Sequence, residues 1–122
     1  MENFELTPEE VNVIKSVQNK LYGQSYAMGW HSKPREIGTR IALCHSELSE
    51  ALEGARKGLM DDHLKHRKML EVELADAVIR IFDLAGSEGL DLAGAISEKH
   101  YYNAHREDHK LENRNKEGGK AF

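Results

Sequence analysis

The chain has 122 residues, of which 39% are hydrophobic and 31% charged, and its formal net charge is −4. This length suits one domain with one core, and the composition is that of an ordinary soluble protein. The negative charge argues against a surface for nucleic acid, and no apolar run is long enough to span a bilayer. We therefore expect neither a nucleic-acid partner nor a membrane partner.

The first ten residues are acidic and have neither a basic start nor an apolar core, so they do not form a secretory or transit signal. We expect a cytoplasmic protein. Cys44 is the single cysteine, which excludes an internal disulfide. Its place among regularly spaced apolar residues favours a plain buried thiol over a nucleophile.

The first predicted helix opens at Thr7, Pro8 and Glu10. Thr7 is a suitable cap, Pro8 takes the first helical position, and Glu10 completes a capping box. We expect this helix to end near Gly23 or to reach towards Met28.

The loop that follows contains glycine, proline and the only tryptophan, Trp30, with His31 beside it. A lone aromatic side chain in such a loop more often packs over the end of a helical bundle, and stacking on a nucleobase is the minority interpretation. We keep Trp30 and His31 as candidate substrate-binding residues.

The second predicted helix runs from about Pro34 to Arg56 or Lys57 and is followed by Gly58, a typical C-terminal glycine. Its apolar residues recur at steps of three and four, which predicts one buried stripe. The stripe contains Ile37, Ile41, Cys44, Leu48, Leu52, Ala55 and Leu59.

The third predicted helix starts at Asp61 or Asp62 and ends around residues 86–89. Its first turns are strongly basic, so we interpret His63 and His66 as solvated residues and not as metal ligands. Its later turns are apolar around most of the circumference, so we expect a central helix. The one polar strip of these turns contains Glu73, Asp76, Arg80 and Asp83.

The fourth predicted helix is capped by Asp91 and carries Lys99, Asn103 and Arg106 along one face, at steps of four and three residues. Residues 113–122 are polar and contain glycine, which predicts a loose tail after a domain of residues 1–112. Strand patterns are absent, so we predict an all-α four-helix bundle. Its small core favours a homo-oligomer whose protomers complete each other.

Two pairs of carboxylates stand out on the second and third helices: Glu47 with Glu50, and Glu73 with Asp76. Residues three apart on a helix point the same way, so each pair presents its oxygens together. One such pair is common on a solvated face, whereas two pairs in consecutive apolar helices favour a site for Mg²⁺ or Mn²⁺. With the cations of the fourth helix, this set suits phosphoryl or nucleotidyl transfer, although Lys99 or Arg106 alone would be an ordinary surface cation.

These segments together resemble the MazG-like all-α nucleoside triphosphate pyrophosphatases. The resemblance rests on E-x-x-E at Glu47–Glu50, E-x-x-D at Glu73–Asp76 and K-x-x-x-N-x-x-R at Lys99–Arg106, in that order. It extends from about Gly29 to Arg106, which is most of the chain.

The resemblance implies a hydrolase that converts a nucleoside triphosphate to the monophosphate and pyrophosphate. The four carboxylates would bind Mg²⁺, with Mn²⁺ as a substitute, and the metals would hold the triphosphate and activate a water for attack at the α-phosphorus. Lys99 and Arg106 would contact phosphates, Asn103 the sugar or a phosphate, and Trp30 and His31 would shape the base pocket. Such proteins generally work as dimers or dimers of dimers. Base and sugar preference stay open.

Two other functions are alternatives to this one. A di-iron bundle normally needs Glu-x-x-His on two helices, and no histidine of the chain lies three residues after a glutamate. A non-enzymatic interaction module, in which the carboxylates form structural salt bridges with Arg80 and the cations of the fourth helix, stays open as the alternative.

Overall fold

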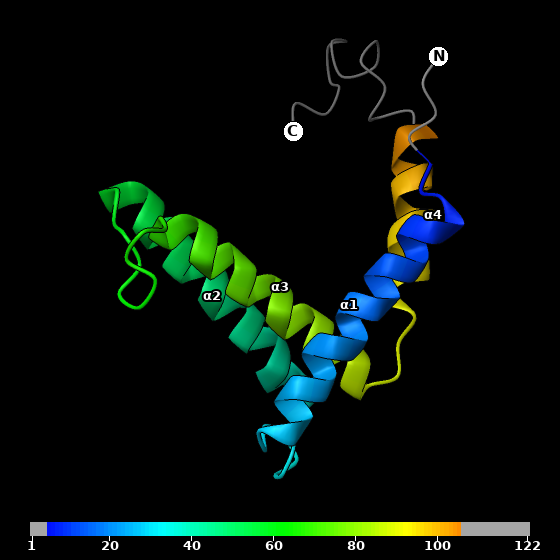
Figure 1. The fold of residues 1–122 in the computed structure, drawn as a ribbon, viewed down its shortest axis with the longest axis horizontal. Coiled ribbons are helices and arrows are strands. Elements are labelled where there is room, and N and C mark those ends of the chain that lie inside the picture. Colours follow the sequence, from blue (N-terminus) through cyan, green and yellow to red (C-terminus); the bar gives the residue numbers. More distant parts are fainter. Residues whose placement is uncertain (1–4, 106–122) are drawn as a thin grey trace. The chain divides into compact units, whose positions relative to one another are not determined.

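The computed structural model describes residues 5–105. Within them the chain forms four helices: α1 (Pro8–Ala27), α2 (Ile37–Lys57), α3 (Met69–Ser87) and α4 (Leu92–His105) (Figure 1). This part of the chain contains no strand, only an isolated β-bridge between Met60 and Lys68. The all-α prediction is confirmed. None of the described helices is both long enough and apolar enough to cross a membrane.

The chain divides into two compact units. Residues 17–90 form what we call the middle unit, which contains the end of α1, all of α2 and α3, and the loops between them. The terminal unit consists of residues 1–16 and 91–122 and contains the start of α1 and all of α4. All four predicted carboxylates, Trp30 and His31 belong to the middle unit.

The helix ends follow the predicted capping signals. The backbone N–H of Glu10 donates to Thr7 Oγ1 at 3.1 Å, and that of Thr7 donates to Glu10 Oε1 at 2.9 Å. Gly58 ends α2 with a φ of 62°, a left-handed conformation that glycine adopts without strain. The backbone N–H of Gly94 donates to Asp91 Oδ1 at 3.0 Å and so caps α4. α2 starts at Ile37, three residues later than predicted, because Glu36 is still extended, with ψ at 144°.

The prediction that the third helix starts at Asp61 or Asp62 is wrong. Oδ2 of Asp61 accepts the backbone N–H groups of His63 at 2.9 Å and Leu64 at 2.7 Å, which folds the chain into a turn. The N–H of Asp61 then donates to the carbonyl of Arg67 at 2.9 Å and closes a loop. A short polar side chain therefore outcompetes the helical backbone here, and α3 begins only at Met69.

α2 and α3 run side by side as an antiparallel pair (Figure 1). They approach closely because small residues stand at the contact: a Cβ on Gly54 would lie 2.8 Å from Cγ of Met69. Ala51 on α2 and Ala77 on α3 are also buried. Further along α3, a Cβ on Gly86 would lie 2.7 Å from Cβ of Tyr22, so the end of α1 packs as closely.

The predicted buried stripe of α2 is wrong for most of its members. Cys44 is buried, as predicted, and burial raises the pKa of its thiol. The large apolar side chains are exposed: Ile37, Ile41, Leu48, Leu52 and Leu59. On α3 the exposed apolar side chains are Leu70, Leu74, Val78 and Ile81. The two helices face each other through small and acidic residues, so their large apolar side chains point elsewhere.

Candidate metal centre

Three carboxylates converge between α2 and α3: Glu47, Glu73 and Asp76. One oxygen from each lies within 4.8 Å of the others. We call these three residues the carboxylate group. Glu47 and Glu73 are each only 9% exposed, and Asp76 is half-buried. Two members of the polar strip of α3, Glu73 and Asp76, are therefore buried or half-buried.

Helix geometry explains this convergence. Glu47 lies three residues after Cys44 and four before Ala51, and all three are buried on one face of α2. On α3, Glu73 and Asp76 share the face that also buries Ala77. Because the contact is made by small residues, the two backbones come close enough for the carboxylates to meet.

Glu73 is the member whose electrostatics are most unusual. Burial and the neighbouring carboxylates, first Glu47 and then Glu50 and Asp76, raise the pKa of Glu73 to about 8. Its Oε2 is buried and accepts no hydrogen bond. A buried carboxylate oxygen without a donor is costly unless the group is protonated or a cation binds it. The residues present therefore fit a bound divalent ion.

The other two members differ because Arg80 is nearby. Burial by itself would raise the pKa of Glu47, but the hydrogen bond and charge of Arg80 outweigh it and hold that pKa below its ordinary value. Nε of Arg80 donates to Oε1 of Glu47 at 2.8 Å. Burial and the charge of Glu47 raise the pKa of Asp76. In the described part of the chain, no ion pair reaches Glu73 or Asp76.

The fourth predicted ligand, Glu50, stands apart from the other three. Its side chain is exposed, and it is not a member of the carboxylate group. Its charge still contributes to the raised pKa of Glu73, so it lies at the edge of the site. Three of the four predicted ligands are brought together, and these three could hold a metal ion.

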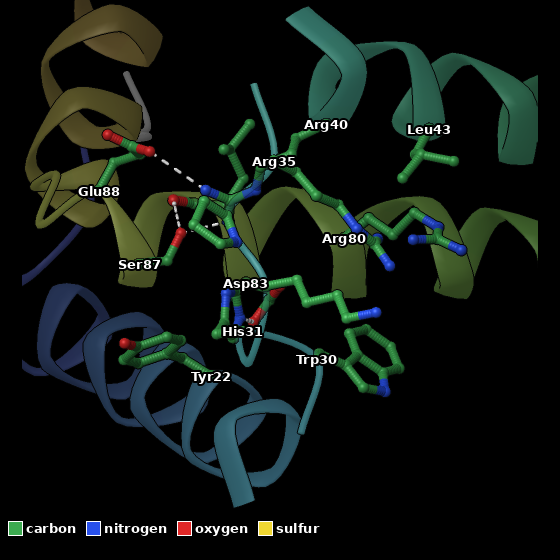
Figure 2. Close-up of a pocket in the computed structure, with 13 residues that line it drawn as sticks. Tyr22, Trp30, His31, Arg35, Arg40, Leu43, Arg80, Asp83, Ser87 and Glu88 are labelled. Atoms are coloured by element: carbon green, nitrogen blue, oxygen red, sulfur yellow. Dashed lines mark hydrogen bonds and ion pairs between the residues drawn. The ribbon is translucent and has the colours of Figure 1, made fainter. Parts of the chain in front are cut away.

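A cavity of about 320 Å³ adjoins Arg80 within the middle unit. Its aromatic wall consists of Tyr22, Trp30 and His31 (Figure 2). Its cationic residues are Lys33, Arg35, Arg40 and Arg80. The guanidinium of Arg80 lies 5.9 Å from the centroid of the Trp30 ring. Arg80 therefore contacts Glu47 of the carboxylate group through Nε, and the same side chain also lines the cavity.

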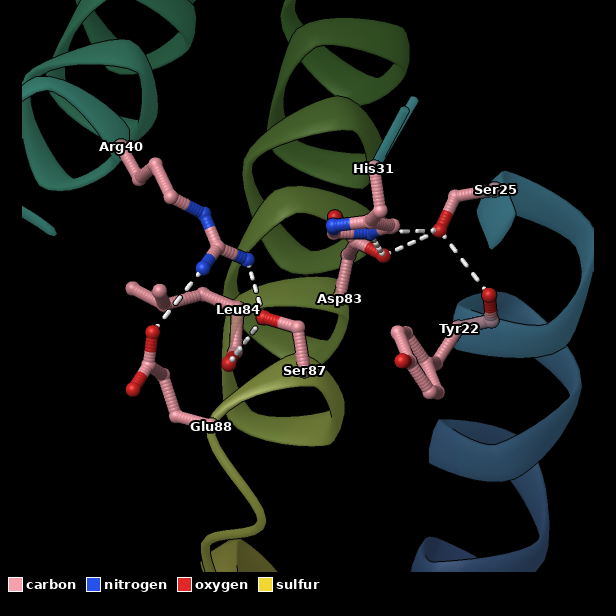
Figure 3. Close-up of polar contacts among 8 residues, drawn as sticks. All are labelled: Tyr22, Ser25, His31, Arg40, Asp83, Leu84, Ser87 and Glu88. Atoms are coloured by element: carbon pink, nitrogen blue, oxygen red, sulfur yellow. Dashed lines mark hydrogen bonds and ion pairs between the residues drawn. The ribbon is translucent and has the colours of Figure 1, made fainter. Parts of the chain in front are cut away.

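Sequence reasoning missed the two contacts that shape this cavity. Nε2 of His31 lies 2.9 Å from Oδ1 of Asp83 and 3.2 Å from Oγ of Ser25, and Ser25 also donates to that same Oδ1 (Figure 3). On the other side, Arg40 donates to Oε1 of Glu88 at 3.1 Å and to Oγ of Ser87. These pairs join residues remote in sequence, so no local pattern could have indicated them.

Ser25, His31 and Asp83 are the residue types of a hydrolytic triad, but their geometry is different. In a triad, the histidine contacts the carboxylate through one ring nitrogen and the serine through the other. Here both partners contact Nε2. The arrangement therefore anchors the loop before α2 to α3 and does not activate the serine hydroxyl.

The predicted residues of the fourth helix belong to the terminal unit. Nζ of Lys99 lies 4.6 Å from the centroid of the Tyr102 ring, and Lys99 is exposed. Asn103 is half-buried. Arg106 lies outside the described residues, as does the predicted tail of residues 113–122. Their proposed contacts with a substrate stay predictions.

Comparison of the chain with protein-family models, with curated proteins and with solved structures finds no match. The resemblance to MazG-like pyrophosphatases therefore stays a prediction. Any assignment of function rests on the carboxylate group and the adjoining cavity.

Proposed function

We propose that this chain is a Mg²⁺-dependent nucleoside triphosphate pyrophosphohydrolase of the MazG-like all-α type, acting on the cytoplasmic nucleotide pool. The observation that carries the proposal is the carboxylate group, with oxygens of Glu47, Glu73 and Asp76 within 4.8 Å of one another. The buried, unpartnered Oε2 of Glu73 supports a cation at this place. A structural cluster of acids would instead be expected to pair each member with a basic residue.

The proposed reaction is hydrolysis at the α-phosphorus. A water oxygen forms a bond to that phosphorus, the bond from it to the bridging oxygen of the β-phosphate breaks, and pyrophosphate leaves. The products are the nucleoside monophosphate and pyrophosphate. When bound, Mg²⁺, or Mn²⁺ in its place, supplies a Lewis acid that neutralises phosphate oxygens and lowers the pKa of a bound water.

Different residues of this chain would then bind the metal ion and the phosphates. Glu73, whose pKa is raised to about 8, would give up its proton and hold the ion together with Asp76 and Glu47. Arg80 keeps one nitrogen on Glu47 and offers its other N–H groups to a phosphate. Lys33 and Arg35 line the cavity without an ion pair to any described residue, so they are free to meet an anionic ligand.

The nucleoside would occupy the cavity. Trp30 provides an aromatic face for a base, and the volume of about 320 Å³ lies at the lower end of the range for small-molecule sites. From the resemblance, Lys99 and Arg106 would add phosphate contacts and Asn103 a contact to sugar or phosphate. Whether the sugar is ribose or deoxyribose is left open.

A direct test is to incubate the protein with a panel of ribo- and deoxynucleoside triphosphates and to measure pyrophosphate. Release is expected with Mg²⁺ or Mn²⁺ and not with excess EDTA. Glu73→Gln should abolish release while leaving the helix content unchanged. Pyrophosphate release that survives both EDTA and this substitution would end the proposal.

One observation favours the alternative, an interaction module without catalysis. The ion pair between Arg80 and Glu47 is a structural salt bridge of the kind that such a module needs. A module predicts no stabilisation by Mg²⁺, whereas the proposed metal site predicts a rise in melting temperature with Mg²⁺ concentration. The two unpaired carboxylates, Glu73 and Asp76, support the metal site.

We also propose that the chain forms a homodimer or a homotetramer. The large apolar side chains of α2 are exposed, and Leu52 is 57% exposed. The buried apolar residues of the described chain are all small: Cys44, Ala51, Ala77, Ala85 and Ala93. A core without large side chains buries little apolar area, so covering the stripes of α2 and α3 with a second copy would supply the missing stabilisation.

A further inference from the structure

Asp83 is a buried charge in the wall of the cavity. It is 7% exposed. Its Oδ1 accepts hydrogen bonds from Ser25 and His31, as Figure 3 shows. Its Oδ2 accepts none from the described residues. A carboxylate has about four acceptor positions, so half of this group is left without a donor.

The basic residues around the cavity do not supply that donor. Arg40 is held by Glu88 and Ser87, and Arg80 is held by Glu47. No ion pair joins Lys33 or Arg35 to Asp83. A ligand in the cavity can therefore donate to the free oxygen.

His31 adds a second acceptor. Nε2 must carry the proton that it shares with the carboxylate of Asp83, because an ionised carboxylate cannot donate. In the neutral ring, Nδ1 is then an acceptor, and no described residue donates to it. The free oxygen of Asp83 therefore accepts an N–H donor of a ligand, and Nδ1 of His31 accepts a second one when the ring carries a single proton.

Trp30 provides an aromatic face in this cavity. Its indole lines the same cavity, beside Arg80, as Figure 2 shows. An aromatic ring next to free acceptors suits a planar heterocycle that stacks on its face and donates from its edge.

We propose that this cavity binds the base of the nucleotide and that Asp83 selects bases with an exocyclic amino group. The identification of the ligand as a nucleotide rests on the proposed function. Cytosine, adenine and guanine each present an amino group with two N–H donors. Thymine and uracil present a single N–H between two carbonyl oxygens, whose lone pairs would face the carboxylate.

The cost of a buried polar group without a partner sets the scale of the preference, because the single N–H of thymine or uracil satisfies the carboxylate less well. Leaving such a group unsatisfied costs about 1–3 kcal/mol, which corresponds to roughly 5- to 150-fold in affinity. We therefore expect amino-bearing bases to bind at least about fivefold more tightly than thymine or uracil.

The test uses the intrinsic fluorescence of Trp30, the only tryptophan. The full chain is titrated in EDTA with dCMP, dAMP, dGMP, dTMP and dUMP, so that neither the metal nor hydrolysis enters the readout. At least one amino-bearing nucleotide should change the fluorescence with a Kd at least about fivefold below those of dTMP and dUMP. No change with any nucleotide, or equal or tighter binding of dTMP and dUMP, would overturn the proposal.

Two substitutions separate selection by Asp83 from its structural contact with His31. Asp83→Asn replaces an acceptor-only group by one that also donates, so the preference should fall to less than about threefold. Ser25→Ala removes one donor to Oδ1 but leaves Oδ2 free, so the preference should persist. If Asp83→Asn does not fold, the comparison of the five nucleotides on the natural chain still tests whether the cavity prefers amino-bearing bases. An unchanged preference in a folded Asp83→Asn protein would contradict the assignment.

The outcome is distinguishable from failure of the proposed function. Nucleotide binding is measured in EDTA, so its outcome depends neither on the metal site nor on hydrolysis. Base-selective binding without pyrophosphate release would refute the hydrolase and keep the base site. Pyrophosphate release without base selectivity would refute the base site and keep the hydrolase.

Discussion

Arg80 on α3 donates its Nε–H to Oε1 of Glu47 on α2 at 2.8 Å, and the same guanidinium lies 5.9 Å from the centroid of the Trp30 ring. One side chain thus links the carboxylate group to the aromatic wall of the cavity. It also explains why the three carboxylates differ: Glu47 forms an ion pair with Arg80, whereas no ion pair reaches Glu73 or Asp76 in the described chain. A ligand that spans both features would pass this guanidinium.

Glu73→Gln should abolish stabilisation by Mg²⁺. In the natural protein, Mg²⁺ at about 100 times its Kd should raise the free energy of unfolding by ~2.7 kcal/mol, which is of order 10 °C in melting temperature. Loss of this ligand should weaken Mg²⁺ binding by at least ~100-fold, because even partners behind a ligand cost 10- to 100-fold. Thermal melting with and without Mg²⁺ measures both effects.

Glu50→Gln is the matched comparison for that experiment. Glu50 is exposed and stands outside the carboxylate group, so its substitution should reduce the Mg²⁺-dependent shift less than Glu73→Gln does. Equal loss in the two variants would show that Glu50 is a full ligand, as the sequence motif predicted. If Mg²⁺ raises the melting temperature of both variants as much as that of the natural chain, the metal does not bind at these carboxylates.

Stability without metal should fall as the pH rises through the titration of Glu73. The pKa of this carboxyl is raised from an ordinary value of 4.5 to about 8. Between these pH values, the folded protein keeps a proton that the unfolded chain has released, so the free energy of unfolding decreases with increasing pH. The contribution is complete below pH 4.5 and is lost as the pH approaches and passes 8.

Thermal melting in EDTA across this pH range measures the effect. Glu73→Gln, which cannot titrate at this position, is the control that subtracts the histidines and other carboxylates. The decline should be shallower in Glu73→Gln than in the natural chain. Parallel pH profiles of the two proteins would show that Glu73 titrates normally.

Gly54→Ala should destabilise the protein. The added Cβ would lie 2.8 Å from Cγ and 2.9 Å from Cβ of Met69, and 3.2 Å from the backbone nitrogen of Leu70. The backbone on α3 cannot yield cheaply, so about 1–3 kcal/mol should be lost, outweighing the gain in helix propensity. Chemical denaturation measures the change.

Gly23→Ala on α1 is the matched control. Its added Cβ would meet no atom within 4 Å, so only helix propensity changes and stability should rise by ~0.5–1 kcal/mol. If Gly54→Ala also gained stability, the close approach of α2 and α3 would be refuted.

Leu52→Lys should dissociate the proposed oligomer. Leu52 lies in the exposed stripe of α2, and a charge in an apolar interface costs several kcal/mol of desolvation. Sedimentation velocity should show a dimer or tetramer for the natural chain and a smaller species for Leu52→Lys. Val13→Lys, at another exposed apolar position, on α1, should leave the assembly unchanged. A natural chain that is monomeric at high concentration contradicts the proposal.

Local chemistry was readable from the sequence where it depends on neighbours along the chain. Thr7 with Glu10, Gly58 and Asp91 act through their own or nearby backbone groups, so the helix ends that they specify were predicted to within a residue. The spacing of Glu73 and Asp76 likewise places both on one face of α3 from helix geometry alone. The prediction of a helix start at Asp61 failed because this side chain accepts hydrogen bonds from two backbone N–H groups and starts a turn.

Tertiary structure decided which face of each helix is covered. Periodicity identified the apolar stripe of α2 but could not show that Gly54 packs against α3, that Ala51 and Ala77 are buried, and that Leu48 and Leu52 stay exposed. The same contact brings Glu47, and not Glu50, next to Glu73 and Asp76. The pairing of Asp83 with Ser25 and His31 also became visible only in the fold, because hydrogen bonds between distant segments depend on packing geometry, for which a single sequence carries no local signal.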